Sequence, residues 1–115
     1  YEIGRILNIE TIFVERVNNN FQIRRGFEIN RNHKILVVED VITTGKSSLE
    51  CSSLAEKCGA EVIGFASLID RTGGKSEINK KIVSQIKLDI STFTADNIPE
   101  NLKKLKAIKP GSRNL

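Results

Sequence analysis

A strand–loop–helix stretch in the first half of the chain constrains the fold more than any other feature. Residues 34–38 ("KILVV") are rich in β-branched side chains and predict a strand buried on both faces of a parallel sheet. A helix is expected to begin near Gly45 and to stop at Gly59, and residues 61–69 ("EVIGFASLI") predict the next strand. Strand, helix and strand joined by short links form a βαβ unit with a right-handed parallel crossover. The sequence therefore predicts an α/β fold, an open parallel sheet with flanking helices.

The other segments carry weaker signals. Leu49, Cys51, Leu54, Ala55 and Cys58 form the expected apolar stripe of the central helix. The further expected elements are the end of a helix over residues 1–10 with Ile3, Ile6 and Leu7 on one face, a short buried strand over 11–14, a hairpin-like segment turning at Asn18, Asn19 and Asn20, a strand over 83–88, and a short helical piece from Asn97.

The start of the chain is unusual for a translated protein. The 115 residues contain no Met, and the sequence begins with "YEIGRILNIE", a pattern typical of a helix already under way. We therefore expect an N-terminally truncated chain, the C-terminal portion of one domain that covers residues 1–115.

Composition excludes several classes of protein. The net charge of +4 is too small to indicate nucleic-acid binding, and aromatic residues make up only 5% with no Trp. No apolar run reaches membrane-spanning length. Cys51 and Cys58 lie two helical turns apart, so we expect free thiols and a cytoplasmic protein. The single His, His33, is interpreted as a loop residue, and no metal-ligating set is predicted.

The segment "VVEDVITTGKSS", residues 37–48, lies where an α/β sheet places its ligands, beyond the carboxyl end of a strand. Its "GKSS" end is similar to a nucleotide P-loop. A Walker A motif, however, needs a glycine five residues before Gly45, and this chain has Asp40 there. A carboxylate at that position would repel the phosphates, so the P-loop interpretation is rejected.

A phosphorylated ribose fits this segment better. Residues 43–47 lead into a helix N-terminus, whose backbone N–H groups and dipole suit one phosphate monoester. Glu39 and Asp40 can accept hydrogen bonds from neighbouring sugar hydroxyls. The alternative is a plain strand–loop–helix connection in which the acids are solvated and the threonines cap the helix.

The segment "VVEDVITTGKSS" resembles the phosphoribosyl pyrophosphate (PRPP) motif of type I phosphoribosyltransferases, here over residues 35–48. Within that family, "FVERVNNNFQIRRGFEI", "SLIDRTGG" and "KPGSR" are similar to segments of the orotate phosphoribosyltransferases. The resemblance covers nearly the whole chain. It implies a type I phosphoribosyltransferase-like fold whose N-terminal part is missing here, and transfer of the phosphoribosyl group from PRPP to orotate in UMP synthesis.

The resemblance also implies roles for particular residues. Thr43 and Arg71 would contact orotate, and a guanidinium is a natural partner for the orotate carboxylate. The alternative for Arg71 is a surface ion pair with Asp70. Arg16 and Asp40 would serve catalysis. The residues expected to bind PRPP are Glu39, Asp40, Val41, Ile42, Thr43, Thr44, Gly45, Lys46 and Ser47.

In the reaction that the resemblance implies, Mg²⁺ is bound to the pyrophosphate and cationic side chains stabilise its departure. Residues 15–29 resemble a mobile loop that reaches the neighbouring site of a homodimer. Many family members carry an Arg-Lys-Glu run with further Lys and His in this loop, whereas this chain has neither Lys nor His there. Arg16 is the best match for a pyrophosphate contact, and the roles of Arg24 and Arg25 stay open.

Two other functions remain as alternatives. The first is a phosphoribosyltransferase for a purine base, against which the arginine in "DRTGG" argues, since a purine lacks a carboxylate. The second is a PRPP-sensing regulator without enzyme activity, which would be expected to carry a DNA- or RNA-binding surface.

Overall fold

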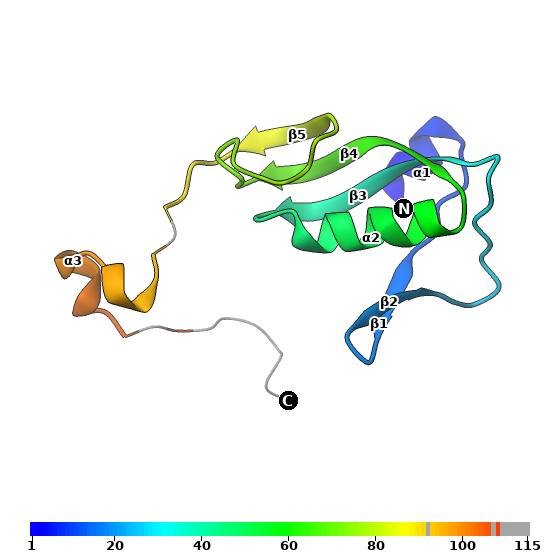
Figure 1. Ribbon diagram of the computed structural model, residues 1–115. Coiled ribbons are helices and arrows are strands. Elements are labelled where there is room, and N and C mark those ends of the chain that lie inside the picture. The colour runs from blue at the N-terminus through cyan, green and yellow to red at the C-terminus, as the bar shows by residue number, and fades with distance from the viewer. Residues whose placement is uncertain (92, 107, 109–115) are drawn as a thin grey trace.

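The computed structural model describes residues 1–91, 93–106 and 108 of the chain. Figure 1 shows the elements in chain order: α1 (Glu2–Leu7), β1 (Val14–Val17), β2 (Asn20–Ile23), β3 (Lys34–Ile42), α2 (Lys46–Lys57), β4 (Glu61–Asp70), β5 (Ile82–Lys87), a 3₁₀ turn η1 (Ala95–Asn97) and α3 (Glu100–Lys103). None of the helices in these ranges combines the length and the apolar character needed to cross a membrane.

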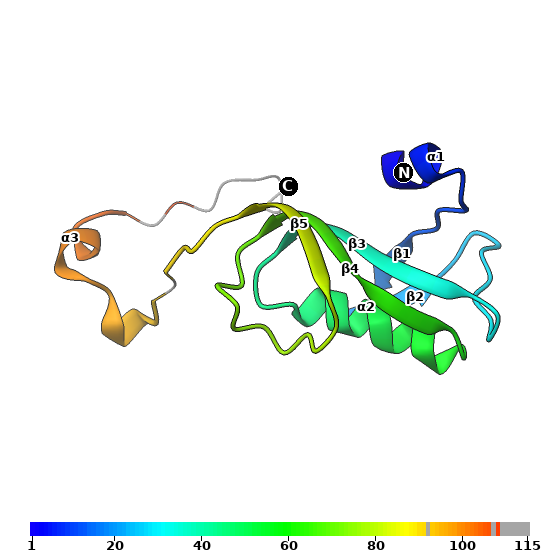
Figure 2. The same ribbon diagram turned by 90° about the horizontal axis from the view of Figure 1, so that it is seen from above.

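The main sheet has three strands in the order β3, β4, β5, and both pairs are parallel. The expected βαβ unit is confirmed, because α2 connects β3 to its parallel neighbour β4. The strand expected over residues 83–88 is found as β5, one residue earlier than predicted. The connection from β4 to β5 runs on the α2 side of the sheet (Figure 2). All three carboxyl ends therefore meet at one edge, where residues 43–45, 71–75 and 88–91 follow them.

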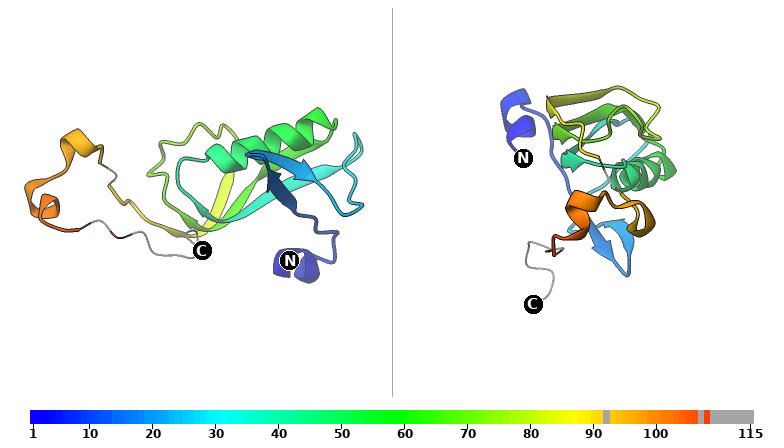
Figure 3. Two further views of the ribbon diagram at one scale, coloured as in Figure 1. Left: turned by 90° about the horizontal axis from the view of Figure 1, so that it is seen from below. Right: turned by 90° about the vertical axis from the view of Figure 1, so that its left-hand side faces the viewer.

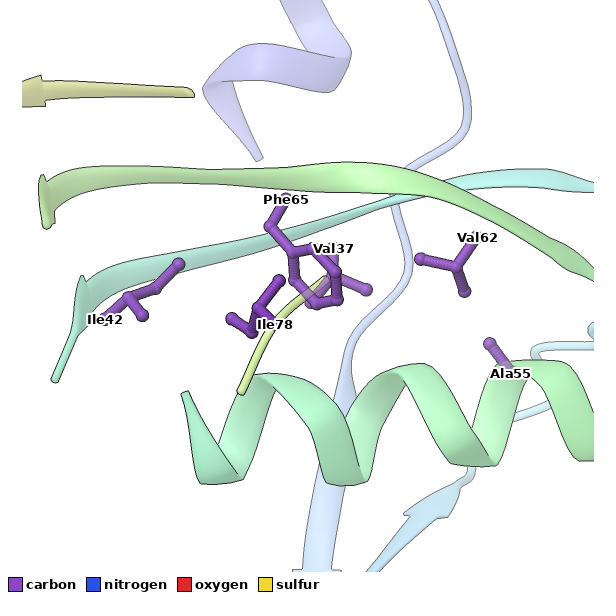
Figure 4. Close-up of a cluster of buried hydrophobic side chains, with 6 residues drawn as sticks. All are labelled: Val37, Ile42, Ala55, Val62, Phe65 and Ile78. Carbon is purple, nitrogen blue, oxygen red and sulfur yellow. The ribbon is translucent and has the colours of Figure 1, made fainter. Parts of the chain in front are cut away.

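The core lies between the sheet and α2 (Figure 4). Its buried side chains come from β3, β4, α2 and the β4–β5 connection. They are Val37, Ile42, Ala55, Val62, Phe65 and Ile78. Of the stripe expected on α2, Ala55 is buried, Leu49 and Cys51 pack against the core, and Cys58 is exposed. Ser48 and Ser52 are also buried on α2, although neither belongs to the apolar stripe that the sequence predicts.

The opposite face of the sheet is open to solvent in this chain. Val38, Ile63, Leu68 and Val83 are each more than half exposed, with Leu68 at 62%. The prediction that residues 34–38 are buried on both faces was therefore wrong for Val38. α2 covers one face of β3, and side chains that alternate with the core residues point away from it.

The N-terminal third of the chain differs from its prediction in one element. Residues 11–13 lie outside any strand and β1 begins at Val14, so the buried strand expected over 11–14 was wrong. The register explains the boundary, because Val14 and Ile23 form the outermost pair of the hairpin. The hairpin itself is confirmed. Asn18 and Asn19 adopt φ values of 48° and 63°, which asparagine tolerates in tight turns.

The two ends of the chain add short helices. α1 confirms a helix at the start, but Ile6 and Leu7 are exposed and α1 lies apart from the sheet (Figure 2). The helical piece expected from Asn97 is found as η1 and α3. The "KPGSR" segment, residues 109–113, lies outside the described residues.

Candidate functional site

The loop between β3 and α2 forms the centre of the candidate site. β3 does not stop at Val38 but continues to Ile42, whose side chain is 1% exposed and belongs to the core. Glu39, Asp40 and Val41 are therefore strand residues. The chain then bends through residues 43–45, and α2 begins at Lys46. Thr43 and Thr44 are exposed at this bend, and Ser47 is half-buried in the first turn of α2.

Gly45 is required by the geometry of this bend. Its φ is 83°, and a Cβ atom there would lie 2.9 Å from Cδ1 of Ile78. Its carbonyl accepts the N–H of Leu49 at 2.9 Å and so starts the hydrogen bonds of α2. The Lys46 N–H donates to Thr44 Oγ1 at 3.3 Å, but Gly45 itself offers no side-chain cap. The other N–H groups of this first turn are left for solvent or an anion.

Glu39 and Asp40 have different surroundings, although they are adjacent in the sequence. Successive strand residues point to opposite faces. Glu39 is half-buried on the α2 side, where it accepts a hydrogen bond from the Ser48 hydroxyl. Burial, and then the Glu39 carboxylate, raise the pKa of the neighbouring Cys51 thiol. Asp40 is exposed, and its Oδ1 accepts the N–H of Val41 at 2.8 Å.

The loop after β4 is tied to the end of β3. The backbone N–H of Arg71 donates to the carbonyl of Ile42 at 2.8 Å. Asp70 is 9% exposed, and its Oδ1 accepts the Thr72 N–H at 2.8 Å. Within the described ranges Arg71 forms no ion pair with Asp70, and its Nε is buried without a hydrogen-bond partner. The Arg71 Nε therefore keeps an unused hydrogen-bond donor among the described residues.

These two loops line one groove with a volume of about 1320 Å³. Besides the loops, its walls come from one side of α2, the tip of the hairpin, and the segment after β5. The lining residues are Asn19, Asn20, Phe21, Thr43, Thr44, Lys46, Leu49, Glu50, Ser53, Leu54, Lys57, Arg71, Thr72, Gly73, Lys75, Glu77, Asp89, Ile90, Ser91 and Phe93. The groove brings Thr43, Thr44, Lys46 and Arg71 together, whereas Glu39, Asp40 and Arg16 are not among its lining residues.

Sequence reasoning missed some of this lining. Asp89 follows β5, so the rule that ligands lie beyond strand carboxyl ends could have pointed to it. Lys75 lies in the loop after β4, but its place in the groove depends on the turn at Gly73 and Gly74, both with positive φ. Glu50 and Phe21 carry no local signal, because their positions depend on how the hairpin packs on α2.

The hairpin places its arginines in two groups. Arg24 and Arg25 both pair with Glu15, at 3.3 and 2.6 Å. Arg16 instead reaches α2, where its Nη2 lies 2.6 Å from Glu50 Oε2. The Arg16 guanidinium also lies 4.2 Å from the centre of the Phe21 ring. Among these three arginines, Arg16 is the one that connects the hairpin to a wall of the groove.

Comparison with known proteins places this geometry in a family. Residues 7–102 match the phosphoribosyl transferase domain. The chain belongs to the phosphoribosyltransferase family. The fold expected from the PRPP motif is thereby confirmed. The groove at the carboxyl edge of the sheet is the candidate active site of this phosphoribosyltransferase domain.

Several curated phosphoribosyltransferases are similar over nearly the whole chain. Proteins named orotate phosphoribosyltransferase from Maricaulis maris and Novosphingobium aromaticivorans are each 42% identical, over 115 and 113 residues. One from a Methylobacterium species is 44% identical over 114 residues. These matches cover 98–100% of this chain but only 58–59% of the relatives. The chain thus spans about three-fifths of their length.

A solved structure supports the fold independently. The crystal structure of adenine phosphoribosyltransferase from Leishmania tarentolae superimposes with a TM-score of 0.60. The match covers 78% of this chain and 56% of that one, at 20% sequence identity. At this level of identity the likeness shows the phosphoribosyltransferase fold and does not distinguish between bases.

Proposed function

We propose that this chain is part of an orotate phosphoribosyltransferase, which transfers the 5-phosphoribosyl group from PRPP to orotate and releases pyrophosphate. One observation carries the choice of base. Arg71 lines the same groove as Thr43, and its buried Nε has no acceptor among the described residues. An anionic base such as orotate can supply that acceptor. The names of the similar bacterial proteins agree with this assignment.

The phosphate of PRPP is proposed to bind at the N-terminus of α2. The first-turn N–H groups and the helix dipole favour an anion there, and Lys46 adds a positive charge. Gly45 is buried against Ile78, and the lack of a side chain lets the backbone make the bend that leads into α2. Val41, Ile42, Thr43, Thr44 and Ser47 complete the proposed PRPP segment by forming or flanking the bend.

Glu39 and Asp40 are both proposed to act near the ribose, but in different roles. Asp40 is exposed, so its second carboxylate oxygen can accept a hydrogen bond from a ribose hydroxyl. Glu39 already holds Ser48 in the first turn of α2. Asp40 lies outside the lining of the groove, so its proposed ribose contact rests on the family resemblance, and Glu39 is kept as a PRPP residue that also fixes the helix N-terminus.

In the proposed reaction, a nitrogen of orotate attacks C1 of the ribose and the bond to pyrophosphate breaks. Positive charge develops on the sugar and negative charge on the leaving group, so preorganised charges can lower the barrier. Asp40 would face the developing positive charge, and Arg16 the pyrophosphate. The hydrogen bond from Arg71 to Ile42 would hold the base-binding loop next to the phosphate-binding loop.

Mg²⁺ is proposed as the cofactor, bound to the diphosphate of PRPP. The described residues contain no cluster of three or more His, Cys, Asp or Glu side chains that could cage a metal ion. Mg²⁺ usually binds through one or two carboxylates together with substrate phosphates, so the phosphate oxygens of PRPP would hold the ion. When bound, the ion would neutralise charge on the leaving group. We also propose a homodimer, as implied by the family resemblance of residues 15–29, and a cytoplasmic location, as expected for the free thiols of Cys51 and Cys58.

Calorimetric titration of orotate and of adenine, each with and without PRPP–Mg²⁺, tests the proposal on the 115-residue chain. We expect orotate to bind and adenine not to bind. Arg71→Gln should weaken orotate binding by about tenfold or more, because it removes charge-assisted hydrogen bonds to a carboxylate. Lys75→Gln is the matched control in the same loop and should change the affinity about threefold at most.

Three results would contradict the assignment. Binding of adenine instead of orotate would indicate a purine enzyme. Binding of PRPP with neither base would indicate a sensor rather than a transferase. An unchanged orotate affinity in Arg71→Gln would remove the argument for the substrate, even if orotate itself bound.

A further inference from the structure

The hairpin made by β1 and β2 is connected to α2 through one braced arginine. Arg16 Nη2 lies 2.6 Å from Glu50 Oε2, and the two side chains are 40% and 37% exposed. Arg16 Nη1 donates to the Asn19 carbonyl at 2.6 Å, and the guanidinium lies over the Phe21 ring. The guanidinium is therefore held in place from within the hairpin, while its charge is neutralised by a carboxylate on α2.

This contact lies beside the candidate active site, because Glu50 lines the groove although Arg16 itself does not. The tip of the hairpin also lines the groove, where β2 packs against α2 (Figure 3). Lys46 and Glu50 are four residues apart on α2, which places them on the same side of the helix, about 6 Å apart along its axis. The Arg16–Glu50 pair thus lies one helical turn from the proposed phosphate site.

We propose that Glu50 is a positioning residue that holds the hairpin on α2 through Arg16 and releases Arg16 to the diphosphate of the substrate. The proposal rests on the proposed function, because it takes the groove as the place where a diphosphate binds. A diphosphate carries more negative charge than a carboxylate, and both can form bidentate hydrogen bonds with a guanidinium. The diphosphate therefore competes directly with Glu50 for Arg16.

The strength of the pair suits such an exchange. Half-exposed ion pairs contribute little to stability, so a ligand can replace the pair at small cost. The other two arginines of the hairpin do not hold α2, since Arg24 and Arg25 both pair with Glu15. Once Arg16 leaves, the bare Glu50 carboxylate would repel the diphosphate. Glu50 therefore weakens binding of the substrate while it keeps the hairpin ordered in the free protein.

Amide hydrogen exchange in the hairpin, residues 14–23, tests the first half of this proposal without any ligand. In Glu50→Gln we expect these amides to exchange roughly two- to fivefold faster than in the parent chain, which is the effect of losing one half-exposed ion pair. Glu56→Gln is the matched control, because Glu56 is also on α2 but pairs with Lys80 at 3.3 Å. It should leave hairpin exchange unchanged. Equal exchange in Glu50→Gln and Glu56→Gln would overturn the proposal.

Inorganic pyrophosphate with Mg²⁺ tests the second half. It should speed hairpin exchange in the parent chain and have no further effect in Glu50→Gln, whose affinity for pyrophosphate should be roughly two- to fivefold higher. A lower affinity in Glu50→Gln, or an unchanged hairpin in the parent chain at saturating pyrophosphate, would overturn the proposal. Failure of the proposed function is distinguishable, since it would appear as absent PRPP and orotate binding while the ligand-free effect of Glu50→Gln persists.

Discussion

The two walls of the groove are held in place by different forces. The wall made by residues 43–46 rests on the core, with Ile42 buried below it and Gly45 packed against Ile78. The wall made by the hairpin is tied to α2 by the Arg16–Glu50 ion pair, whereas Arg24 and Arg25 pair with Glu15 of the hairpin itself. One wall is fixed by close packing, which tolerates little change, and the other by an ion pair exposed to solvent.

This difference matches what each wall is proposed to do. A phosphate site at a helix N-terminus works only if its N–H groups are already in place, so rigid support is useful there. A segment that must contact a leaving group and then release it benefits from weak, exchangeable contacts. The comparison predicts that the loop responds to changes in packing and the hairpin to changes in charge.

The largest effect is expected from Gly45→Ala. The new Cβ would lie 2.9 Å from Ile78 in a backbone with φ of 83°, so strain and overpacking add. We expect a loss of about 2–4 kcal/mol in the free energy of unfolding, measured by urea denaturation. Gly26→Ala is the matched control, since Gly26 has φ of 78° but a methyl group added there would meet nothing within 4 Å.

Gly26→Ala should cost about 1 kcal/mol, from the backbone alone. The difference between the two variants therefore measures how closely the loop is packed. Equal losses would contradict the claim that the core supports the loop.

A somewhat smaller effect is expected from Ser48→Ala. This change removes the hydrogen bond to Glu39 and leaves a half-buried carboxylate without that partner, which should cost about 1–3 kcal/mol. Ser53→Ala, on the exposed side of the same helix, should change the unfolding free energy by at most about 0.5 kcal/mol. Denaturation of the two variants in parallel checks this, and a neutral Ser48→Ala would show that the bond to Glu39 contributes nothing.

The reactivity of the two thiols measures how closely α2 packs on the sheet, and the expected effect on stability is smaller. Burial of the Cys51 side chain on α2, and then the nearby Glu39 carboxylate, raise the pKa of the Cys51 thiol, whereas Cys58 is exposed. Because the thiolate is the reactive form, iodoacetamide at about pH 8 should modify Cys58 at least tenfold faster than Cys51, as followed by mass spectrometry. A pKa raised by folding also means that stability is lost as pH rises toward the pKa of folded Cys51. Equal modification rates would contradict a closely packed helix face.

The smallest effect is expected from salt, and it should separate the two walls. At about 1 M NaCl the screening length falls to roughly 3 Å, so exposed ion pairs weaken. Exchange of the hairpin amides should then rise by about two- to fivefold at most. The Leu49 amide, which donates to Gly45, should not change. Hairpin exchange that is insensitive to salt would show that packing, rather than charge, holds this wall.

The sequence predicted the groove wall made by residues 43–46 better than the wall made by the hairpin. The βαβ unit and the bend at Gly45 follow from local patterns, because β-branched runs and a glycine before a helix carry their own signals. The position of Arg16 depends on Glu50, 34 residues away, and no local pattern encodes that contact. The sequence predicts a strand that ends at Val38, before Glu39 and Asp40, and so suggests one role for both acids. The continuation of this strand to Ile42 puts them on opposite faces.

The exposure of the sheet face opposite α2 was also not predicted from the sequence. A run such as "KILVV" predicts burial but does not say which residues of the chain supply the cover. In this chain α2 covers one face, and Val38 and Leu68 on the other are 51% and 62% exposed.

The central claim is that backbone N–H groups at the start of α2 bind a sugar phosphate. Titration of the ¹⁵N-labelled chain with ribose 5-phosphate, followed by amide NMR shifts, tests it most directly. The account predicts saturable shifts concentrated in residues 43–48 that are lost in Gly45→Ala but kept in Gly26→Ala. Shifts centred elsewhere, or no shifts in residues 43–48 at millimolar ligand, would contradict it.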